Sequence, residues 1–354
     1  MARIMVAMSG GVDSSMAAAL LLEQGHTICG ATLRLYDAPD TAEGACGSLQ
    51  DAEDARLTCE RLGVPHYTFA FQKAFAQEVI GRFADGYRRG ETPNPCIDCN
   101  RYIKFRKLLD KAAEMGWDYV ATGHYARVDR DPESGRYRLR KATDATKDQT
   151  YVLYGLSQED LSRVLFPLGE FTKAQIREMA AQRGLVAAHK PDSQDICFVK
   201  DGDYAGFLER ERGVPSPAGD FVTGDGTVLG RHKGIIHYTI GQRKGLGLSL
   251  PAPLYVTAKD TVRNRVILGE NEDLLAETLM ADRLNWSAIQ PPAEPLSVLA
   301  KARYKQPEAP AVVIPLVDGN VRVVFKQPQR ALTPGQAVVF YREDIVLGGG
   351  TIIA

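Results

Sequence analysis

The sequence lacks a long apolar stretch, has few cysteines and carries almost no net charge. Its longest unbroken apolar run extends only from Met16 to Leu22, whereas a membrane-spanning helix needs roughly 20 apolar residues. Six cysteines in 354 residues are too few for the disulfide scaffold of a small secreted domain. The N-terminal segment has no basic region and no long apolar region, so it does not resemble a signal peptide. We therefore expect a cytoplasmic protein with reduced thiols and no membrane contact.

The composition is that of an ordinary globular protein. Apolar residues make up 44% and charged residues 25%, with 33 glycines and 19 prolines, which excludes collagen, a coiled coil and wholesale disorder. A net charge of −1 neither requires nor excludes a nucleic-acid partner, because such partners bind local basic patches. At roughly 100–200 residues per domain, the length indicates two or three domains.

The first half of the chain alternates strands with helices. Strands are expected at 3–8, 27–36, 66–71 and 118–122, and helices at 14–24, 49–62, 73–87 and 102–115. This alternation predicts a doubly wound parallel sheet of the α/β class. Glycine and proline are dense from 202 to 247, and short β-rich runs follow from Leu254 onward. The second half therefore predicts a small central module and an all-β barrel or sandwich.

A glycine-rich turn joins the first strand to the first helix. It reads Met8-Ser9-Gly10-Gly11-Val12-Asp13-Ser14-Ser15 and lacks the lysine of a Walker loop. Two glycines let backbone N–H groups surround an oxyanion, and a helix N-terminus adds donors and partial positive charge. Asp13 suits a Mg²⁺ ion that bridges phosphate oxygens. The alternative is an ordinary turn with a Ser or Asp helix cap, but a cap needs one such residue and not the whole string.

Three cysteines stand in polar, motif-like surroundings. Cys96 and Cys99 form a C-x-x-C pair after two prolines, and Cys197 lies in Asp192–Phe198. A zinc site, a redox pair and sulfur transfer by a persulfide are the three alternatives. Zinc is the weakest of them, because the spacing supplies no fourth ligand. Cys29 and Cys59 fit core positions, and Cys46 has no assigned role.

The loop string resembles that of the PP-loop ATP pyrophosphatases, which adenylate an oxygen of a second substrate. Seven further motifs, in order along the chain, resemble the tRNA-specific 2-thiouridylase (MnmA/TrmU) family over nearly the whole length. They are T-P-N-P-x-x-x-C-N from Thr92, A-T-G-H-Y-A-R from Ala121, K-D-Q-T-Y-V-L from Lys147, D-S-Q-D-I-C-F from Asp192, T-I-G-Q-R-K-G-L-G from Thr239, Arg303-Tyr304 and T-P-G-Q-A-V-V-F-Y from Thr333.

This resemblance implies a PP-loop catalytic domain (1–200), a small central domain (201–270) and a C-terminal β-barrel (271–354) with tRNA contacts. It implies that ATP adenylates O2 of the wobble uridine in a tRNA and that sulfur then displaces AMP. Cys99 would be the nucleophile and Cys197 the persulfide carrier. The implied ATP-binding residues are Ala7, Met8, Ser9, Gly10, Gly11, Val12, Asp13, Ser14, Leu33 and Gly123. The implied target-base residues are Asn94, Pro95 and Cys96, and the implied tRNA contacts are His124, Lys147, Asp148, Gln149, Arg303, Tyr304 and Gln336.

One position departs from the family pattern. Cys96 stands where many members have Asp, so Cys96, Cys99 and Cys197 could instead hold three irons of a [4Fe–4S] cluster. We expect either this cluster or a persulfide–disulfide route, with sulfide or a sulfur-donor protein as the source. Basic residues at 101–107 and 136–141 are expected to contact RNA phosphates, and the segment from Tyr36 to Gly47 is expected to be mobile.

Two other functions would also fit parts of the sequence pattern. The first is a different PP-loop enzyme, an amidotransferase or ligase that adenylates a small molecule. The second is a non-enzymatic RNA- or nucleotide-binding protein, against which the intact loop and the aligned thiols argue.

Overall fold

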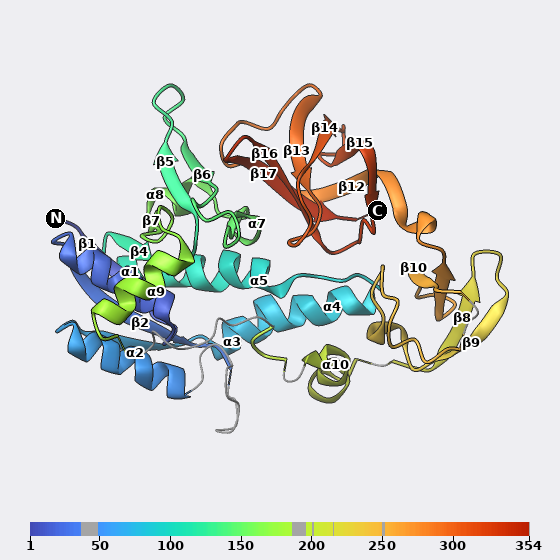
Figure 1. Ribbon diagram of the computed structural model, residues 1–354, viewed down its shortest axis with the longest axis horizontal. Helices are drawn as coiled ribbons and strands as arrows, with labels where there is room; N and C mark the ends of the chain where they lie inside the picture. The colour runs from blue at the N-terminus through green and yellow to red at the C-terminus, as the bar shows by residue number, and fades with distance from the viewer. Residues whose placement is uncertain (37–48, 186–195, 200–201, 215, 250–251, 354) are drawn as a thin grey trace.

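A computed structural model describes residues 1–36, 49–185, 196–199, 202–214, 216–249 and 252–353. The N-terminal part is built on a five-stranded sheet in the order β3-β2-β1-β4-β7 (Figure 1). Its strands are β1 (Arg3–Ala7), β2 (Thr27–Arg34), β3 (His66–Ala70), β4 (Tyr119–Ala121) and β7 (Val164–Leu165). All neighbouring strands run parallel. The predicted α/β class is confirmed.

Helices cover both faces of this sheet, because its strands are apolar on both sides. Ile4 and Val6 of β1 pack with one set of helices, whereas Met5 packs with the other. The first set is α1 (Val12–Glu23), α2 (Leu49–Arg61) and α9 (Lys173–Gln182). The second set is α3 (Gln72–Phe75), η1 (Ala76–Gly81), α4 (Arg82–Arg88), η2 (Cys99–Lys107) and α6 (Leu108–Glu114).

The two long helices of the second set contain π-helical segments that the sequence did not indicate. The helix predicted at 73–87 is divided into α3, η1 and α4, and the one predicted at 102–115 begins earlier, at Cys99, as η2. Short elements complete this half: α5 (Pro95–Asp98), α7 (Thr150–Leu153) and α8 (Gln158–Ser162). Among the helices of the described ranges, none is both long and apolar enough to span a membrane.

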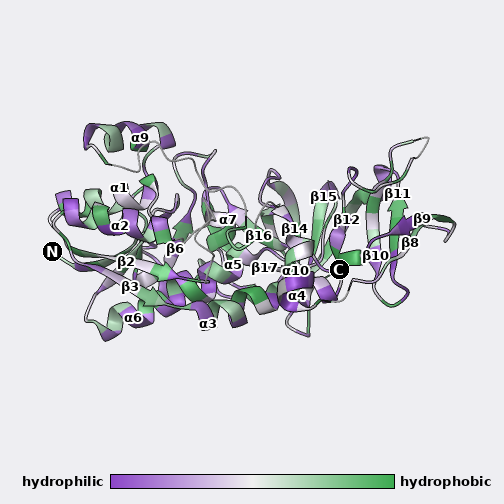
Figure 2. Cartoon of the chain, turned by 90° about the horizontal axis from the view of Figure 1, so that it is seen from below, coloured by the Kyte–Doolittle hydropathy of each residue, from purple (hydrophilic) through white to green (hydrophobic). Residues whose placement is uncertain are grey.

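A smaller four-stranded sheet follows α10 (Tyr204–Arg212), in the order β10-β11-β8-β9. Its strands are β8 (Gly219–Thr223), β9 (Val228–His232), β10 (Tyr255–Asp260) and β11 (Arg265–Gly269), with the short turn η5 (Ile235–His237) packed beside them. The first two β-rich runs after Leu254, at 254–258 and 262–268, therefore belong to this small sheet and not to the C-terminal barrel. Figure 2 shows this sheet at the end of the molecule opposite the N-terminus.

The C-terminal part is a closed barrel of six strands, in the order β12-β15-β14-β13-β16-β17, with β17 pairing back to β12. After η6 (Glu272–Leu274), the strands are β12 (Leu275–Asn285), β13 (Leu296–Lys301), β14 (Ala309–Pro315), β15 (Val321–Arg330), β16 (Ala337–Arg342) and β17 (Ile345–Ile352). The predicted C-terminal barrel is confirmed. A hairpin from the first half, β5 (Arg127–Arg130) and β6 (Tyr137–Arg140), joins the edge of β17.

Candidate functional site

The glycine-rich turn after β1 is shaped as an anion site. Gly10 has a φ of +73°, and a Cβ there would lie 2.4 Å from the Asp51 carbonyl oxygen, so only glycine fits. The Ser9 N–H donates to Ser14 Oγ at 3.1 Å, which in turn donates to the Gly11 carbonyl. Gly11 is the N-cap of helix α1 and supplies no side-chain cap, so the alternative of a Ser- or Asp-capped turn does not hold. A helix N-terminus without a side-chain cap is the arrangement at which anions commonly bind.

Asp13 lies in the first turn of α1 and is held by two residues that the sequence interpretation missed. Lys173 Nζ lies 2.8 Å from each carboxylate oxygen of Asp13, and the Tyr125 hydroxyl donates to Oδ1 at 2.9 Å. Lys173 opens α9 and is 160 residues from Asp13 in the chain. A local sequence pattern cannot predict the pairing of two residues that are so far apart in the chain. Only the order of the strands in the sheet brings the two residues together.

Gly123 and β2 frame the same loop. A Cβ at Gly123 would lie 2.7 Å from the Asp13 carbonyl carbon and from the Ser14 nitrogen, so the chain after β4 touches the loop backbone. From β2, Thr32 Oγ1 donates to the Met8 carbonyl at 3.0 Å, and Leu33 is the next residue, largely buried. The residues predicted to bind ATP thus meet at the carboxyl edge of β1, β2 and β4, where parallel α/β sheets bind ligands.

Cys96 and Cys99 lie at the junction of α5 and η2. The Asn94 side chain caps α5 by accepting the Cys96 N–H at 3.1 Å, and Pro95 occupies the first turn. Cys96 is exposed, whereas Cys99 is buried in the core beneath the sheet. The two thiols therefore face different environments. Cys96 faces solvent beside Tyr304 of the barrel, and Cys99 faces the apolar cluster.

Cys197 packs against the cluster that contains Cys99. The Tyr36 hydroxyl donates to the Cys197 carbonyl at 2.7 Å. The next residue, Phe198, makes edge contacts with the rings of Phe75 and Phe83, each at 5.6 Å between centroids. These contacts seat the Cys197 segment on the same core as Cys99. Asp192–Asp195 of that motif lie outside the described residues, as do Cys46 and most of the segment predicted to be mobile.

The three cysteines do not assemble as metal ligands. Within the described part of the chain, no group of three Cys, His, Asp or Glu side chains is placed to hold a metal ion. The arrangement therefore fits neither a [4Fe–4S] cluster on Cys96, Cys99 and Cys197 nor a structural zinc. For Mg²⁺ the requirement is smaller, because one carboxylate together with substrate phosphates can hold the ion. Asp13 meets that requirement.

The glycine-rich turn, residues 8–15, is called the phosphate loop from here on. The Lys147–Gln149 segment connects this loop to the barrel. Gln149 Oε1 accepts the N–H of Tyr125 at 2.8 Å, beside the Asp13 contact. Asp148 is largely enclosed, and burial raises the pKa of its carboxyl group although Thr150 donates to it. The Tyr304 hydroxyl reaches the Asp148 carbonyl at 3.4 Å. The segment therefore lies between the two regions that the sequence motifs single out.

Arg303 and Gln336 are tied to neighbouring backbone, and His124 is enclosed. Arg303 Nη2 donates to the Ile240 carbonyl at 3.0 Å, and Gln336 Nε2 donates to the Thr92 carbonyl at 2.5 Å. His124 Nδ1 shares a hydrogen bond with Thr122 Oγ1 at 2.7 Å. Burial, with a smaller effect of Lys104, lowers the pKa of His124 to about 3. His124 is therefore uncharged at neutral pH, and its role toward tRNA stays a prediction.

The two basic clusters differ in what they contact. Arg106 and Lys107 of η2 are exposed. In the hairpin, by contrast, Arg138 and Arg140 pair with carboxylates of the hairpin and of β16–β17, including Arg140 Nη2 to Asp344 Oδ1 at 2.8 Å. Arg138 pairs within the hairpin, with Asp129 and Asp131, whereas Arg140 also ties the hairpin to the barrel through Asp344. Contact of residues 136–141 with RNA phosphates stays a prediction.

Comparisons with known proteins agree over the full length. Residues 2–201 match the family described as "tRNA methyl transferase HUP domain", residues 205–270 its "PRC-barrel domain", and residues 276–352 the "Aminomethyltransferase beta-barrel domain". A protein of Acetivibrio thermocellus named tRNA-specific 2-thiouridylase MnmA is 51% identical, covering 99% of both chains. One of Heliobacterium modesticaldum with the same name is 53% identical, over 99% of this chain and 92% of its own.

The chain belongs to the tRNA-specific 2-thiouridylase family. Among solved structures, a 4-thiouridine synthetase–RNA complex with bound ATP is 23% identical, with a TM-score of 0.39, covering 60% of this chain and 50% of its own.

As expected, Cys29 and Cys59 are core residues. Burial raises the pKa of Cys29 to about 12 and that of Cys59 to about 11, so both thiols stay protonated.

Residues 91–99, which carry Cys96 and Cys99, are called the thiol loop. A hollow of about 450 Å³ lies where this loop meets the barrel. Asn94 and Asp98 line it from the loop, and Arg283 and Gly335 from the barrel. Burial raises the pKa of Asp98 to about 6, although Arg82 and Arg283 act in the other direction. The residues around the thiols of this 2-thiouridylase family member thus come from both ends of the chain.

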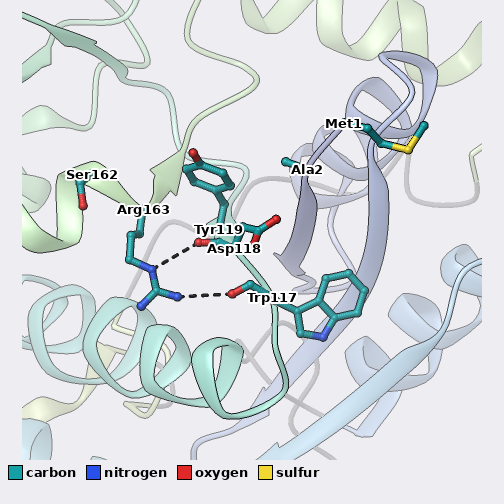
Figure 3. A pocket seen from close by; sticks show the side chains of 7 residues that line it. All are labelled: Met1, Ala2, Trp117, Asp118, Tyr119, Ser162 and Arg163. Carbon is teal, nitrogen blue, oxygen red and sulfur yellow. Dashed lines mark hydrogen bonds between the residues drawn. The ribbon is translucent and has the colours of Figure 1, made fainter.

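A second hollow, of about 520 Å³, lies at the opposite edge of the sheet (Figure 3). It is lined by Met1, Ala2 and the residues just before β4 and β7, where Arg163 donates to the Trp117 and Asp118 carbonyls. These are the amino ends of the strands. Ligands of parallel α/β sheets bind at the carboxyl ends, so this hollow is separate from the family's site.

Proposed function

We propose that this protein is a tRNA 2-thiouridylase of the cytoplasm. ATP adenylates O2 of the wobble uridine, and pyrophosphate leaves. Sulfur then replaces the adenylated oxygen to give 2-thiouridine, and AMP leaves. Residues 1–200 form the catalytic domain, and the central part (201–270) and the barrel (271–354) complete the RNA site.

Each predicted site residue takes a role in this scheme. The turn from Ala7 to Ser14 binds the phosphates, and Asp13 supplies a carboxylate for Mg²⁺, which would neutralise charge on the phosphates. Leu33 and Gly123 border the adenosine, and Asn94, Pro95 and Cys96 receive the target base. The tRNA is contacted by His124, Lys147, Asp148, Gln149, Arg303, Tyr304 and Gln336.

The observation that carries the proposal is that the predicted phosphate loop and both predicted thiol segments belong to one domain. The phosphate loop lies at the carboxyl edge of the sheet, and Cys99 and Cys197 both pack on the apolar cluster beneath it. A carbonyl oxygen is a poor leaving group until it is adenylated. A pair of thiols can then supply sulfur to the activated carbon. Methyl transfer, which the domain descriptions name, needs neither ATP cleavage nor a second thiol.

The sulfur step balances with both cysteines. A persulfide-bearing protein, or sulfide with an oxidant, places a sulfane sulfur on Cys197. Its terminal sulfur attacks C2 of the adenylated uridine, the C2–O bond breaks and AMP leaves. The Cys99 thiolate then attacks Cys197 Sγ, which releases the thiouridine sulfur reduced and leaves a Cys99–Cys197 disulfide. A thiol reductant restores both cysteines for the next turnover.

The test is nucleoside mass spectrometry of tRNA after incubation with the protein, ATP, Mg²⁺ and a persulfide donor. Wild-type protein is expected to form 2-thiouridine, and Cys99→Ser and Cys197→Ser to form none while still releasing pyrophosphate. Cys59→Ala is the control, because this thiol lies in the other cluster, and it should stay active. Absence of 2-thiouridine with wild-type protein under all donors would overturn the proposal. Pyrophosphate release that is independent of tRNA would instead favour a small-molecule ligase.

A further inference from the structure

The phosphate loop has no lysine of its own, yet the fold brings one to it. Lys173 reaches the loop from α9 and lies 2.8 Å from both carboxylate oxygens of Asp13. Its side chain is only 9% exposed, whereas that of Asp13 is 31% exposed. The lysine is therefore enclosed behind the carboxylate, which is the member of the pair nearer to solvent.

The position of Lys173 is poor for helix stability. It is the first residue of α9, after a Thr172–Gln175 capping box, and a cation at a helix N-terminus opposes the helix dipole. Asp144 accepts the Lys173 backbone N–H at 2.9 Å, so acidic capping is already supplied at that end. Burying the ammonium also costs solvation, which its ion pair with Asp13 offsets poorly. Stability of α9 does not account for a lysine here.

The surroundings instead collect positive charge around one carboxylate. The uncapped N-terminus of α1 and the ammonium of Lys173 both face Asp13, and a phosphate chain would bring negative charge to the same place. Tyr125 fixes Asp13 independently, through its 2.9 Å hydrogen bond to Oδ1. Asp13 therefore keeps one anchor when the lysine changes partner.

We propose that Lys173 is the lysine of this phosphate site and binds the β- and γ-phosphates of ATP. In the ATP-free protein Lys173 forms an ion pair with Asp13. With ATP bound, Lys173 would contact the phosphates, and Asp13, still anchored by Tyr125, would supply its carboxylate to Mg²⁺. In the adenylation step O2 of the uridine forms a bond to the α-phosphorus while the bond from the α-phosphorus to its bridging oxygen breaks. The electron pair leaves on pyrophosphate, where the ammonium stabilises the charge. This assignment rests on the proposed adenylation and names a residue for it.

ATP and AMP distinguish this role from a structural one, because AMP lacks the two phosphates in question. Affinities are measured by calorimetry on full-length protein without tRNA or sulfur donor. Lys173→Met is expected to weaken ATP about 10- to 100-fold, the usual range for a charge-assisted bond, and to leave AMP unchanged. Lys173→Arg should recover part of the ATP affinity. Lys111→Met, at an exposed lysine paired with Glu114, is the control and should change neither.

Lys173→Met leaves the negative charge of Asp13 without its lysine, and this charge alone would repel ATP. A double variant that also removes the Asp13 charge separates this effect from the loss of a phosphate contact. The comparison of Asp13→Asn with Asp13→Asn/Lys173→Met, made without Mg²⁺, isolates the lysine, and about tenfold weaker ATP binding is again expected from its loss. Equal ATP affinity in these two proteins, or an equal loss for ATP and AMP in Lys173→Met, would overturn the assignment. Binding needs no tRNA, so a failure of the thiolation proposal would appear separately, as wild-type protein that binds ATP but makes no 2-thiouridine.

Discussion

Replacing Gly335 by alanine should disable sulfur transfer while sparing the ATP site. Gly335 lies in the turn before β16 with a φ of +89°, and a Cβ there would lie 2.9 Å from Glu91 Cβ and 3.0 Å from the Thr92 nitrogen. The same turn holds the thiol loop in register, because the Thr92 N–H donates to the Pro334 carbonyl at 2.9 Å. The added methyl group must push the loop and the barrel apart.

The loss of unfolding free energy expected for Gly335→Ala has two parts. A non-glycine residue in the left-handed region costs about 1–2 kcal/mol, and overpacking against neighbours that cannot yield costs about 1–3 kcal/mol more. Gly319→Ala is the matched control, since Gly319 has a φ of +84° but nothing within 4 Å of its Cβ position. It should lose only the first part of the unfolding free energy.

The assay combines urea unfolding, ATP affinity and single-turnover thiolation at saturating ATP. Gly335→Ala should lose about 2–5 kcal/mol of unfolding free energy and most of its thiolation rate, with unchanged ATP affinity. Gly319→Ala should keep its thiolation rate. If the two variants thiolate equally well, contact with the barrel does not position the thiol loop, and the reasoning fails.

Two further predictions concern carboxylates, one at this junction and one where the β5–β6 hairpin meets the barrel. Burial raises the pKa of Asp98 to about 6, so the folded protein binds the extra proton between about pH 4 and pH 6 and wild-type stability falls as the pH rises through that window. The unfolding free energy of Asp98→Asn should therefore rise relative to that of wild type between about pH 4 and pH 6, by on the order of 1 kcal/mol. A difference between the two proteins that stays constant over this pH range would contradict the raised pKa. Asp344→Asn removes the carboxylate shared by Arg127 and Arg140 and should lower the unfolding free energy by about 1–3 kcal/mol, while ATP affinity, measured by calorimetry, stays unchanged.

The parts of the fold that depend on neighbours in the chain were predictable. The strand, the Ser-Gly-Gly turn and the helix around Gly10 follow one another directly, and the left-handed φ at Gly10 is a local requirement that the sequence displays. The alternation of strands and helices gave the parallel sheet for the same reason. Cys29 and Cys59 could be assigned to the core because they occupy apolar positions of a predicted strand and helix.

The parts that depend on distant partners were not predictable. Strand β17 contains Gly348, Gly349 and Gly350, which are poor strand formers, yet a Cβ at Gly348 would lie 2.3 Å from the Asn285 carbonyl oxygen of β12. The glycines are required by barrel closure, and no local pattern states this. The same applies to Arg140, whose carboxylate partner Asp344 is 204 residues away.

The segment just before the thiols is held by every part of the chain. From the small sheet, Lys259 Nζ donates to the Glu91 carbonyl at 3.3 Å, and a Cβ at Gly90 would lie 2.8 Å from Thr261 Cγ2. From the barrel, Gln336 donates to the Thr92 carbonyl. By contrast, the described residues that contact the phosphate loop, such as Thr32, Tyr125 and Lys173, all precede residue 174. We therefore expect the N-terminal domain to shape the predicted ATP site by its own contacts, whereas the thiol loop is also held by contacts with residues after 200. On this reasoning, sulfur transfer is the step that depends on the central sheet and the barrel.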